Sequence, residues 1–228
     1  MYDITAAQYE ILYKKYIMRP VDHLLLAKGS IKGKKIIDIC AGTMRLSARA
    51  IQLGCDQVWA IEPSEHMIPA KYKRHIGNCE SKLFITKSNL DYIPYDVKYD
   101  IKYDIAFCQQ AINYWFKDKI LKCISKVLKP DGKFIFDTFN TKPSAKPTTK
   151  LYEIDGIKYR EISQLYGSTL YHLQMCDKTA PHFTKFNWIP PKRFNKELHK
   201  VFRDVECRVD GHTSVYICEG LMNIVEGK

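Results

Sequence analysis

Hydrophobic positions between residues 34 and 62 follow the pattern of a buried strand, then of a helix, then of a strand again. Residues 36–39 form a short apolar run, mostly β-branched, as in a strand buried on both faces. Residues 46–53 place leucine and alanine at helical spacing, and Gly54 follows where a helix often ends. Residues 58–61 are apolar again. The order predicts a parallel βαβ unit.

A small-residue turn closes the first strand of this unit, and an acid closes the second. The turn holds one glycine, Gly42, and Glu62 follows it 20 residues later, a spacing suited to hydrogen bonds with ribose hydroxyls. A dinucleotide fingerprint needs three glycines, whereas Cys40 and Arg45 put side chains in the way of a pyrophosphate. Asp38 would repel a pyrophosphate and attract the ammonium of an amino-acid ligand.

The pattern changes beyond residue 140. Residues 141–150 are polar and proline-bearing, as in a linker. Short strand-like runs follow, separated by turn signals at residues 155–156, 166–168 and 177–181, which predicts an antiparallel meander. Its aromatic residues either wall a pocket or pack the meander onto the core. They are Tyr152, Tyr159, Tyr166, Tyr171, Phe183, Phe186 and Trp188, with His172 beside them.

The last part of the chain returns to the pattern of the core. Asn195 is a possible cap of a helix that carries Leu198, Val201 and Phe202 on one face. Residues 205–209 and 213–218 read as a closing hairpin.

The charge and the spacing of cysteine and histidine limit which partners and metal sites we expect. The formal net charge is +11, but 28 of the 36 basic residues are lysine and they are spread along the chain, whereas base readout and phosphate clamps favour arginine. This argues against a nucleic-acid partner. The eight cysteines form no C-x-x-C pair, and the seven histidines show no metal-ligand spacing, so we expect reduced thiols and no metal site.

Residues 36–44 resemble the first motif of class I S-adenosylmethionine-dependent methyltransferases, which usually runs like V-L-D-L-G-C-G-T-G. Here it reads I-I-D-I-C-A-G-T-M, so Cys40 and Met44 stand where the family usually has glycine, and Met44 puts a long side chain beside the cofactor site. The resemblance implies that Asp38 faces the methionine end of the cofactor, that Gly42 passes close to it and that Glu62 binds its ribose.

Further segments resemble the same family in the expected order. Residues 88–94 resemble the loop after the third strand, 99–110 the fourth strand and 128–136 the turn into the fifth. Residues 2–10 resemble the tyrosine-bearing start of many small-molecule methyltransferases, where a helix covers the cofactor; Thr5 and Gln8 form its capping box. The implied fold is doubly wound α/β: a mostly parallel seven-stranded sheet with helices on both faces, an antiparallel last strand and a small antiparallel β insertion.

The chain has the length of one enzyme domain, 228 residues of which 46% are hydrophobic. We expect a helical lid over residues 1–33, a cofactor-binding core over 34–140, a β-rich insertion near the substrate site over 141–191, and a closing helix and hairpin over 192–228. No segment has the length of a membrane span or the pattern of a signal peptide, which predicts a cytoplasmic protein with no membrane contact.

The expected site residues lie at the carboxyl ends of the strands. The expected cofactor contacts are Tyr9, Asp38, Cys40, Ala41, Gly42, Thr43, Glu62, Pro63, Met67, Asn89, Leu90 and Gln109. The end of the fourth strand, residues 109–115, is expected to line the reaction centre, and within it Asn113, Tyr114 and Trp115 are expected to contact the acceptor. The candidates for a general base are Tyr114, His172, His182 and His212, and no spacing singles one out.

The implied reaction is methyl transfer from S-adenosylmethionine to an oxygen or nitrogen of a small molecule. The N-P-P-Y type sequence used on DNA bases or glutamine is replaced by Gln109-Gln110-Ala111-Ile112, which favours a small acceptor. Two alternatives stay open. One is a catalytically silent module, suggested by Cys40 and Met44, and the other is an RNA or protein methyltransferase that docks through its basic surface. The sequence leaves the oligomeric state undetermined.

Overall fold

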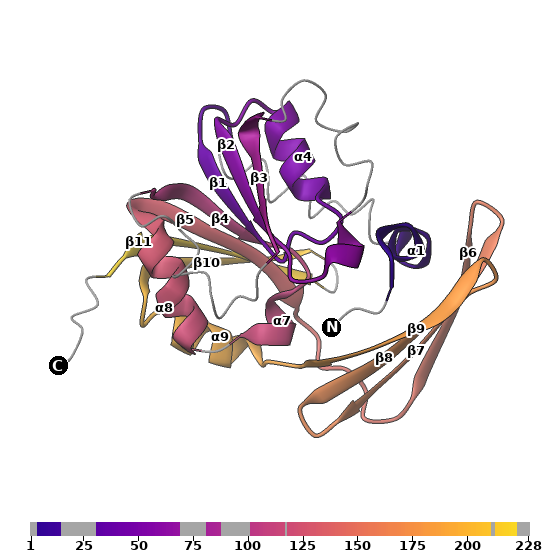
Figure 1. The fold of residues 1–228 in the computed structure, drawn as a ribbon. Helices are drawn as coiled ribbons and strands as arrows, with labels where there is room; N and C mark the ends of the chain where they lie inside the picture. Colours follow the sequence, from indigo (N-terminus) through magenta and orange to yellow (C-terminus); the bar gives the residue numbers. More distant parts are fainter. Residues whose placement is uncertain are drawn as a thin grey trace.

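The structure is a computed structural model, and it describes residues 4–14, 31–68, 81–87, 101–116, 118–210 and 213–222. Figure 1 shows a core of one sheet with helices on both sides, and a second sheet that reaches away from it. Within the described residues, no helix is both long enough and apolar enough to cross a membrane.

Seven strands form the central sheet, in the order β10-β11-β5-β4-β1-β2-β3. They are β1 (Lys35–Ile39), β2 (Gln57–Ile61), β3 (Leu83–Thr86), β4 (Tyr103–Cys108), β5 (Leu128–Phe139), β10 (Phe202–Asp210) and β11 (Thr213–Leu221). Strands β1 to β5 pair in parallel, whereas β11 runs antiparallel to both β5 and β10. The expected seven-stranded sheet, with its antiparallel last strand, is confirmed.

The two faces of this sheet are covered by different helices. Helix α4 (Arg45–Gln52) packs Leu46 and Ile51 onto one face, against Ile36 and Val58. Helices α8 (Asp118–Val127) and α9 (Pro191–Leu198) cover the other face (Figure 1). Because side chains alternate along a strand, neighbouring residues of β1 serve opposite layers of the core.

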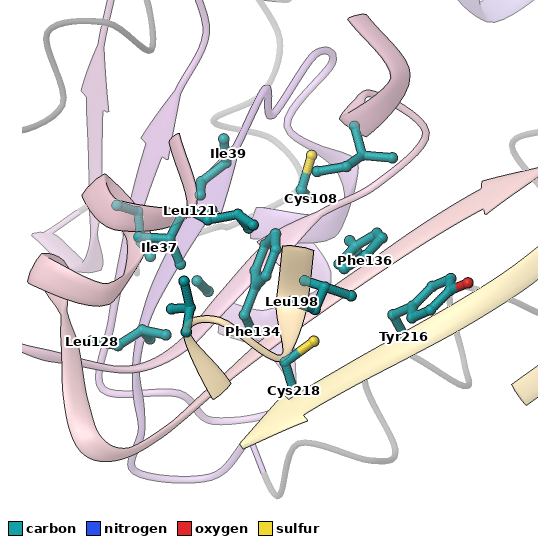
Figure 2. Close-up of a cluster of buried hydrophobic side chains, with 14 of the residues drawn as sticks. Ile37, Ile39, Cys108, Leu121, Leu128, Phe134, Phe136, Leu198, Tyr216 and Cys218 are labelled. Carbon is teal, nitrogen blue, oxygen red and sulfur yellow. The ribbon is translucent and has the colours of Figure 1, made fainter. Parts of the chain in front are cut away.

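Figure 2 shows the larger of the two layers, which joins β1, β4 and β5 to α8, α9 and β11. Phe134 and Phe136 stack at a centroid distance of 5.0 Å, and Phe136 stacks on Tyr216 at 4.9 Å. Phe194 of α9 lies against Phe136 and Tyr216 and is fully buried. This aromatic layer packs β5, β11 and α9 against one another.

Helix α9 begins earlier than the sequence indicated. Pro191 occupies the first turn and Pro190 is the N-cap residue, so the cap expected at Asn195 is wrong and that residue lies inside the helix. Proline suits the first turn because its fixed φ is helical and its missing N–H has no partner there. Val201 and Phe202 belong to the turn into β10 and to β10 itself, although both are buried.

The expected antiparallel meander is confirmed as a four-stranded sheet between β5 and α9. Its strands are β6 (Thr148–Ile154), β7 (Ile157–Tyr166), β8 (Thr169–Cys176) and β9 (Thr179–Asn187), paired in that order. The β6–β7 turn is Asp155-Gly156, both at positive φ, as a two-residue hairpin requires. The first strand begins inside the segment expected to be a linker.

Helix α1 (Ala6–Leu12) joins the meander to the core. Its expected capping box is present, since the Gln8 N–H donates to Thr5 Oγ1 at 3.3 Å and the Thr5 N–H donates to Gln8 Oε1 at 2.9 Å. Tyr159 of β7 donates to the carbonyl oxygen of Ile11 at 3.0 Å, so the helix is held directly against the meander (Figure 1). Two short elements complete the described fold, η1 (Glu65–Met67) and α7 (Ile112–Trp115).

Candidate functional site

The turn after β1 has a backbone conformation that favours glycine, although only one of the three residues concerned is a glycine. Cys40, Gly42 and Met44 all have positive φ, at 57°, 55° and 60°. A side chain in this region costs of order 1–3 kcal/mol, so Cys40 and Met44 strain the backbone where the motif usually has glycine. The turn keeps its shape despite these residues.

Met44 does not obstruct the cleft beside this turn. Its side chain is buried at 1% exposure, it is the N-cap residue of α4, and it does not line the cleft. Its long side chain therefore does not enter this cleft. Met44 starts α4 with a left-handed backbone, and its side chain is buried.

The cleft beside the turn has a volume of about 60 Å³ and brings together most of the expected cofactor contacts. The residues that line it are Tyr9, Asp38, Cys40, Ala41, Gly42, Thr43, Arg45, Leu46, Gln109 and Gln110. Two of these, Arg45 and Leu46, were not expected from the sequence, whereas Gln110 belongs to the segment expected to line the reaction centre. Asn89 and Leu90 lie outside the described residues.

Glu62 lies directly behind the turn and holds it. One carboxylate oxygen accepts the Gly42 N–H at 2.9 Å and the other accepts the Ser64 N–H at 2.8 Å. The side chain is 4% exposed, and burial raises the pKa of this carboxyl while the two backbone N–H groups oppose the rise. Met67 packs beside the same glycine, since a Cβ on Gly42 would lie 3.7 Å from Met67 Cε. Pro63 is exposed next to Glu62.

Asp38 is a second buried carboxyl in the cleft. Its exposure is 2%, and Ser47 of α4 donates its hydroxyl to Asp38 Oδ2 at 2.6 Å. Burial raises the pKa of Asp38 to about 6, opposed by the Ser47 hydrogen bond, with a further rise from the charge of Glu62. The strand therefore presents a carboxyl that changes charge near neutral pH.

A larger cavity of about 320 Å³ lies between the sheet, α1 and the meander. Tyr9 and Gln110 line both this cavity and the cleft, so the two spaces meet at these residues. Of the expected acceptor contacts, Asn113 and Tyr114 line the cavity, and Asn113 accepts a hydrogen bond from Thr138 at 3.1 Å. The side chain of Trp115 lies outside the described residues.

The meander turns a polar face to this cavity. His172 Nε2 lies 3.2 Å from Gln174 Oε1, the Gln174 amide donates to the Tyr152 hydroxyl at 2.9 Å, and that hydroxyl donates to Glu161 at 2.7 Å. Glu161, Gln174 and Thr184 are buried on this face. Buried polar groups are stable when hydrogen-bonded, and this chain of contacts supplies their partners.

The expected aromatic wall is only partly present. Phe186 lines the cavity, with Tyr114 at a centroid distance of 5.2 Å, whereas Tyr171 and Phe183 point to the outer face of the meander and are exposed. The alternation of side chains along β8 and β9 divides the aromatic residues between the two faces.

The candidate bases occupy different surroundings. His172 and Tyr114 line the cavity. His182 is buried against Tyr13, whose hydroxyl lies 2.9 Å from its Nδ1, and it does not line the cavity. His212 lies outside the described residues.

Asp137 is a cavity residue that the sequence analysis missed. It is 1% exposed, follows the apolar run of β5 and accepts the Gln110 N–H at 2.5 Å. The sequence could have revealed Asp137, because it is an acid that directly follows a buried apolar run, as Glu62 does. Within the described residues, no group of three histidines, cysteines or acids is placed to hold a metal ion.

Two comparisons of sequence and one of structure bear on this site. A family model described as a methyltransferase domain matches residues 30–200. The ubiquinone/menaquinone biosynthesis C-methyltransferase UbiE of Vibrio parahaemolyticus is 26% identical over 128 residues, 55% of this chain. The match covers 48% of that protein, so the chain spans about half the length of the curated relative it matches.

Solved structures share the fold at low identity. An S-adenosylmethionine-dependent methyltransferase from Clostridium acetobutylicum is 16% identical with a TM-score of 0.67, over 93% of this chain and 98% of that one. The S-adenosylmethionine-bound amino pentose methyltransferase CalS10 of Micromonospora echinaspora is 11% identical with a TM-score of 0.64, over 88% of each chain. The family model covers most of the chain, including the turn, both acids and the meander. This chain belongs to that methyltransferase-domain family.

Proposed function

We propose that this chain transfers the methyl group of S-adenosylmethionine to an oxygen or nitrogen atom of a small molecule. The observation that carries the proposal is the 320 Å³ cavity, which meets the cofactor cleft at Tyr9 and Gln110. A cavity of this size, with polar groups converging on it, is typical of a small-molecule site. Among proteins of similar fold, CalS10 is named for a small acceptor, an amino pentose.

The cleft and the acid behind it offer groups that suit both ends of S-adenosylmethionine. Asp38 lines the cleft and offers a carboxylate for the ammonium of the methionine end. Glu62 lies behind the turn, and each of its oxygens, which already accepts one backbone N–H, has a second lone pair for a ribose hydroxyl. Gly42, between them, leaves room for close approach. The enclosed volume of about 60 Å³ is smaller than the cofactor, so the cleft would hold only part of it.

The chemistry asked of the protein is mainly positioning. The bound cofactor supplies an electrophilic methyl group on a sulfonium, and the chain has to hold an acceptor atom in line with it. Asn113, Tyr114 and Phe186 shape the side of the cavity nearest α7. His172 and Tyr114 are placed in the cavity to take a proton from a hydroxyl or an amine.

The first test is to follow the methyl group. The protein is incubated with methyl-labelled S-adenosylmethionine and with either the low-mass or the macromolecular fraction of a cell extract. We expect label in a low-mass product whose methyl group is attached to oxygen or nitrogen. Label in RNA or protein, a product methylated at carbon, or no transfer to either fraction would contradict the proposal.

A pair of variants ties this transfer to the cavity. Ser163→Trp fills the cavity from β7, whereas Ile162→Trp places the same side chain on the other face of the strand, because neighbouring residues alternate. We expect Ser163→Trp to lower the transfer rate at least about 100-fold, with cofactor affinity unchanged. Ile162→Trp should retain the rate of the unchanged chain. Equal rates in both variants would argue against this acceptor site.

Removal of the Glu62 carboxylate tests the ribose assignment. Glu62→Ala should weaken S-adenosylmethionine binding by about 1.5–3 kcal/mol, the worth of hydrogen bonds to a charged group. Glu65→Ala is the matched control, since Glu65 is exposed three residues away and pairs with Lys87. Calorimetric titration measures both, and circular dichroism shows that each variant is folded. An unchanged affinity in folded Glu62→Ala would rule the assignment out.

The pH dependence of cofactor binding tests Asp38. Its pKa of about 6 means that the carboxyl loses its charge as the pH falls from 7 to 5, and a neutral carboxyl attracts an ammonium weakly. Glu62 also has a raised pKa and acts in the same direction. The affinity for S-adenosylhomocysteine should therefore fall over this range. In Asp38→Asn the affinity should be low at pH 7 and depend less on pH; an identical pH profile in the variant would contradict the role of Asp38.

A further inference from the structure

Gln110 combines two costly features at the junction of the cleft and the cavity. Its φ is 54°, in the left-handed region that favours glycine. Within the described part of the chain, its side-chain Nε2 is buried and has no hydrogen-bond partner. Strained backbone and an unpaired buried donor each lower stability, and strained residues cluster at active sites and ligand-binding sites.

The fold itself needs only the backbone of this residue. The Gln110 N–H donates to Asp137 Oδ1 at 2.5 Å, which ties the end of β4 to β5. A glycine would make the same hydrogen bond and would relieve the positive φ. The side-chain amide therefore makes no hydrogen bond within the described chain, and its donor is left for a group that binds.

The order of the strands shows which part of the cofactor comes near Gln110. Glu62 ends β2 and Gln110 follows β4, and these strands flank β1 on opposite sides. With the ribose at Glu62, as proposed above, the amino-acid end extends across β1 toward the end of β4. Asp38 lies in β1, between the two.

A positively charged side chain also lines the cleft, on the side of β4. Arg45 opens α4, lines the cleft and donates from Nη2 to Gln109 Oε1 at 3.3 Å, which places its guanidinium beside the end of β4. Arg45 and the Gln110 amide are both donors, whereas Asp38 is an acceptor when ionised. An amino acid carries one group of each kind, an ammonium for Asp38 and a carboxylate for the two donors.

We infer that the Gln110 side-chain amide, together with Arg45, binds the carboxylate of the amino-acid end of S-adenosylmethionine. The assignment rests on the cofactor orientation proposed above. It makes Gln110 a residue that selects ligands with a carboxylate, and it explains why a non-glycine residue is kept at this backbone position.

The test compares two ligands that differ by one group. S-adenosylhomocysteine and its decarboxylated analogue, S-adenosyl-3-thiopropylamine, are titrated calorimetrically into the full chain and into Gln110→Met. Methionine has a similar volume and the same backbone strain, but no amide. We expect Gln110→Met to weaken S-adenosylhomocysteine about 10- to 100-fold, as a lost hydrogen bond to a charged group does, and to leave the decarboxylated analogue within about twofold.

Two controls separate binding from folding. Gln52→Met alters an exposed glutamine of α4 and should leave both affinities unchanged. Gln110→Gly keeps the backbone hydrogen bond to Asp137 and accommodates the positive φ, and it should weaken S-adenosylhomocysteine as Gln110→Met does while circular dichroism shows that it is folded.

Three results would overturn the inference. They are an unchanged S-adenosylhomocysteine affinity in Gln110→Met, an equal loss for both ligands, and an unchanged S-adenosylhomocysteine affinity in folded Gln110→Gly. Failure of the unchanged chain to bind S-adenosylhomocysteine would instead refute the cofactor orientation, and it is recognised without any variant.

Discussion

The carboxylate of Glu62 organises the site, because it holds two turns at once. It accepts the N–H of Gly42 in the turn after β1 and the N–H of Ser64 in the turn after β2, and it does so while buried. The hydrogen bond to Gly42 fixes a turn in which three residues have positive φ, two of them without the help of glycine. In this way one side chain offsets local strain and keeps the cleft open beside Asp38.

The second constraint is the parallel pairing of β2, β1, β4 and β5, which brings four strand ends to one edge of the sheet. Glu62, Asp38, Gln110 and Asp137 come from these four strands or directly after them. Ligands bind at this edge in open α/β sheets because the loops there are free to diverge while the strands stay fixed. The meander and α1 enclose the same edge and turn it into a cavity.

Much of the fold could be predicted because its signals are local. The apolar runs, the single glycine turn and the hairpin turns gave the parallel core, the meander and the closing hairpin. Asp38, Cys40, Gly42 and Thr43 were found because they share one motif. Asp137 was missed because its meeting with Gln110 depends on the register between strands that are distant in sequence, here Cys108 beside Phe136 in β4 and β5. The left-handed backbone and the burial of Met44 were not evident from its residue type.

The central claim is that a turn with cysteine and methionine in place of two glycines still forms an S-adenosylmethionine site. Calorimetric titration of the full chain with S-adenosylmethionine, S-adenosylhomocysteine and a reduced nicotinamide dinucleotide tests it most directly. The account predicts saturable binding of the first two at one site and none of the third, whose pyrophosphate meets the Asp38 carboxylate and a turn that lacks two of the three glycines. Binding of the dinucleotide, or of none of the three, would contradict it.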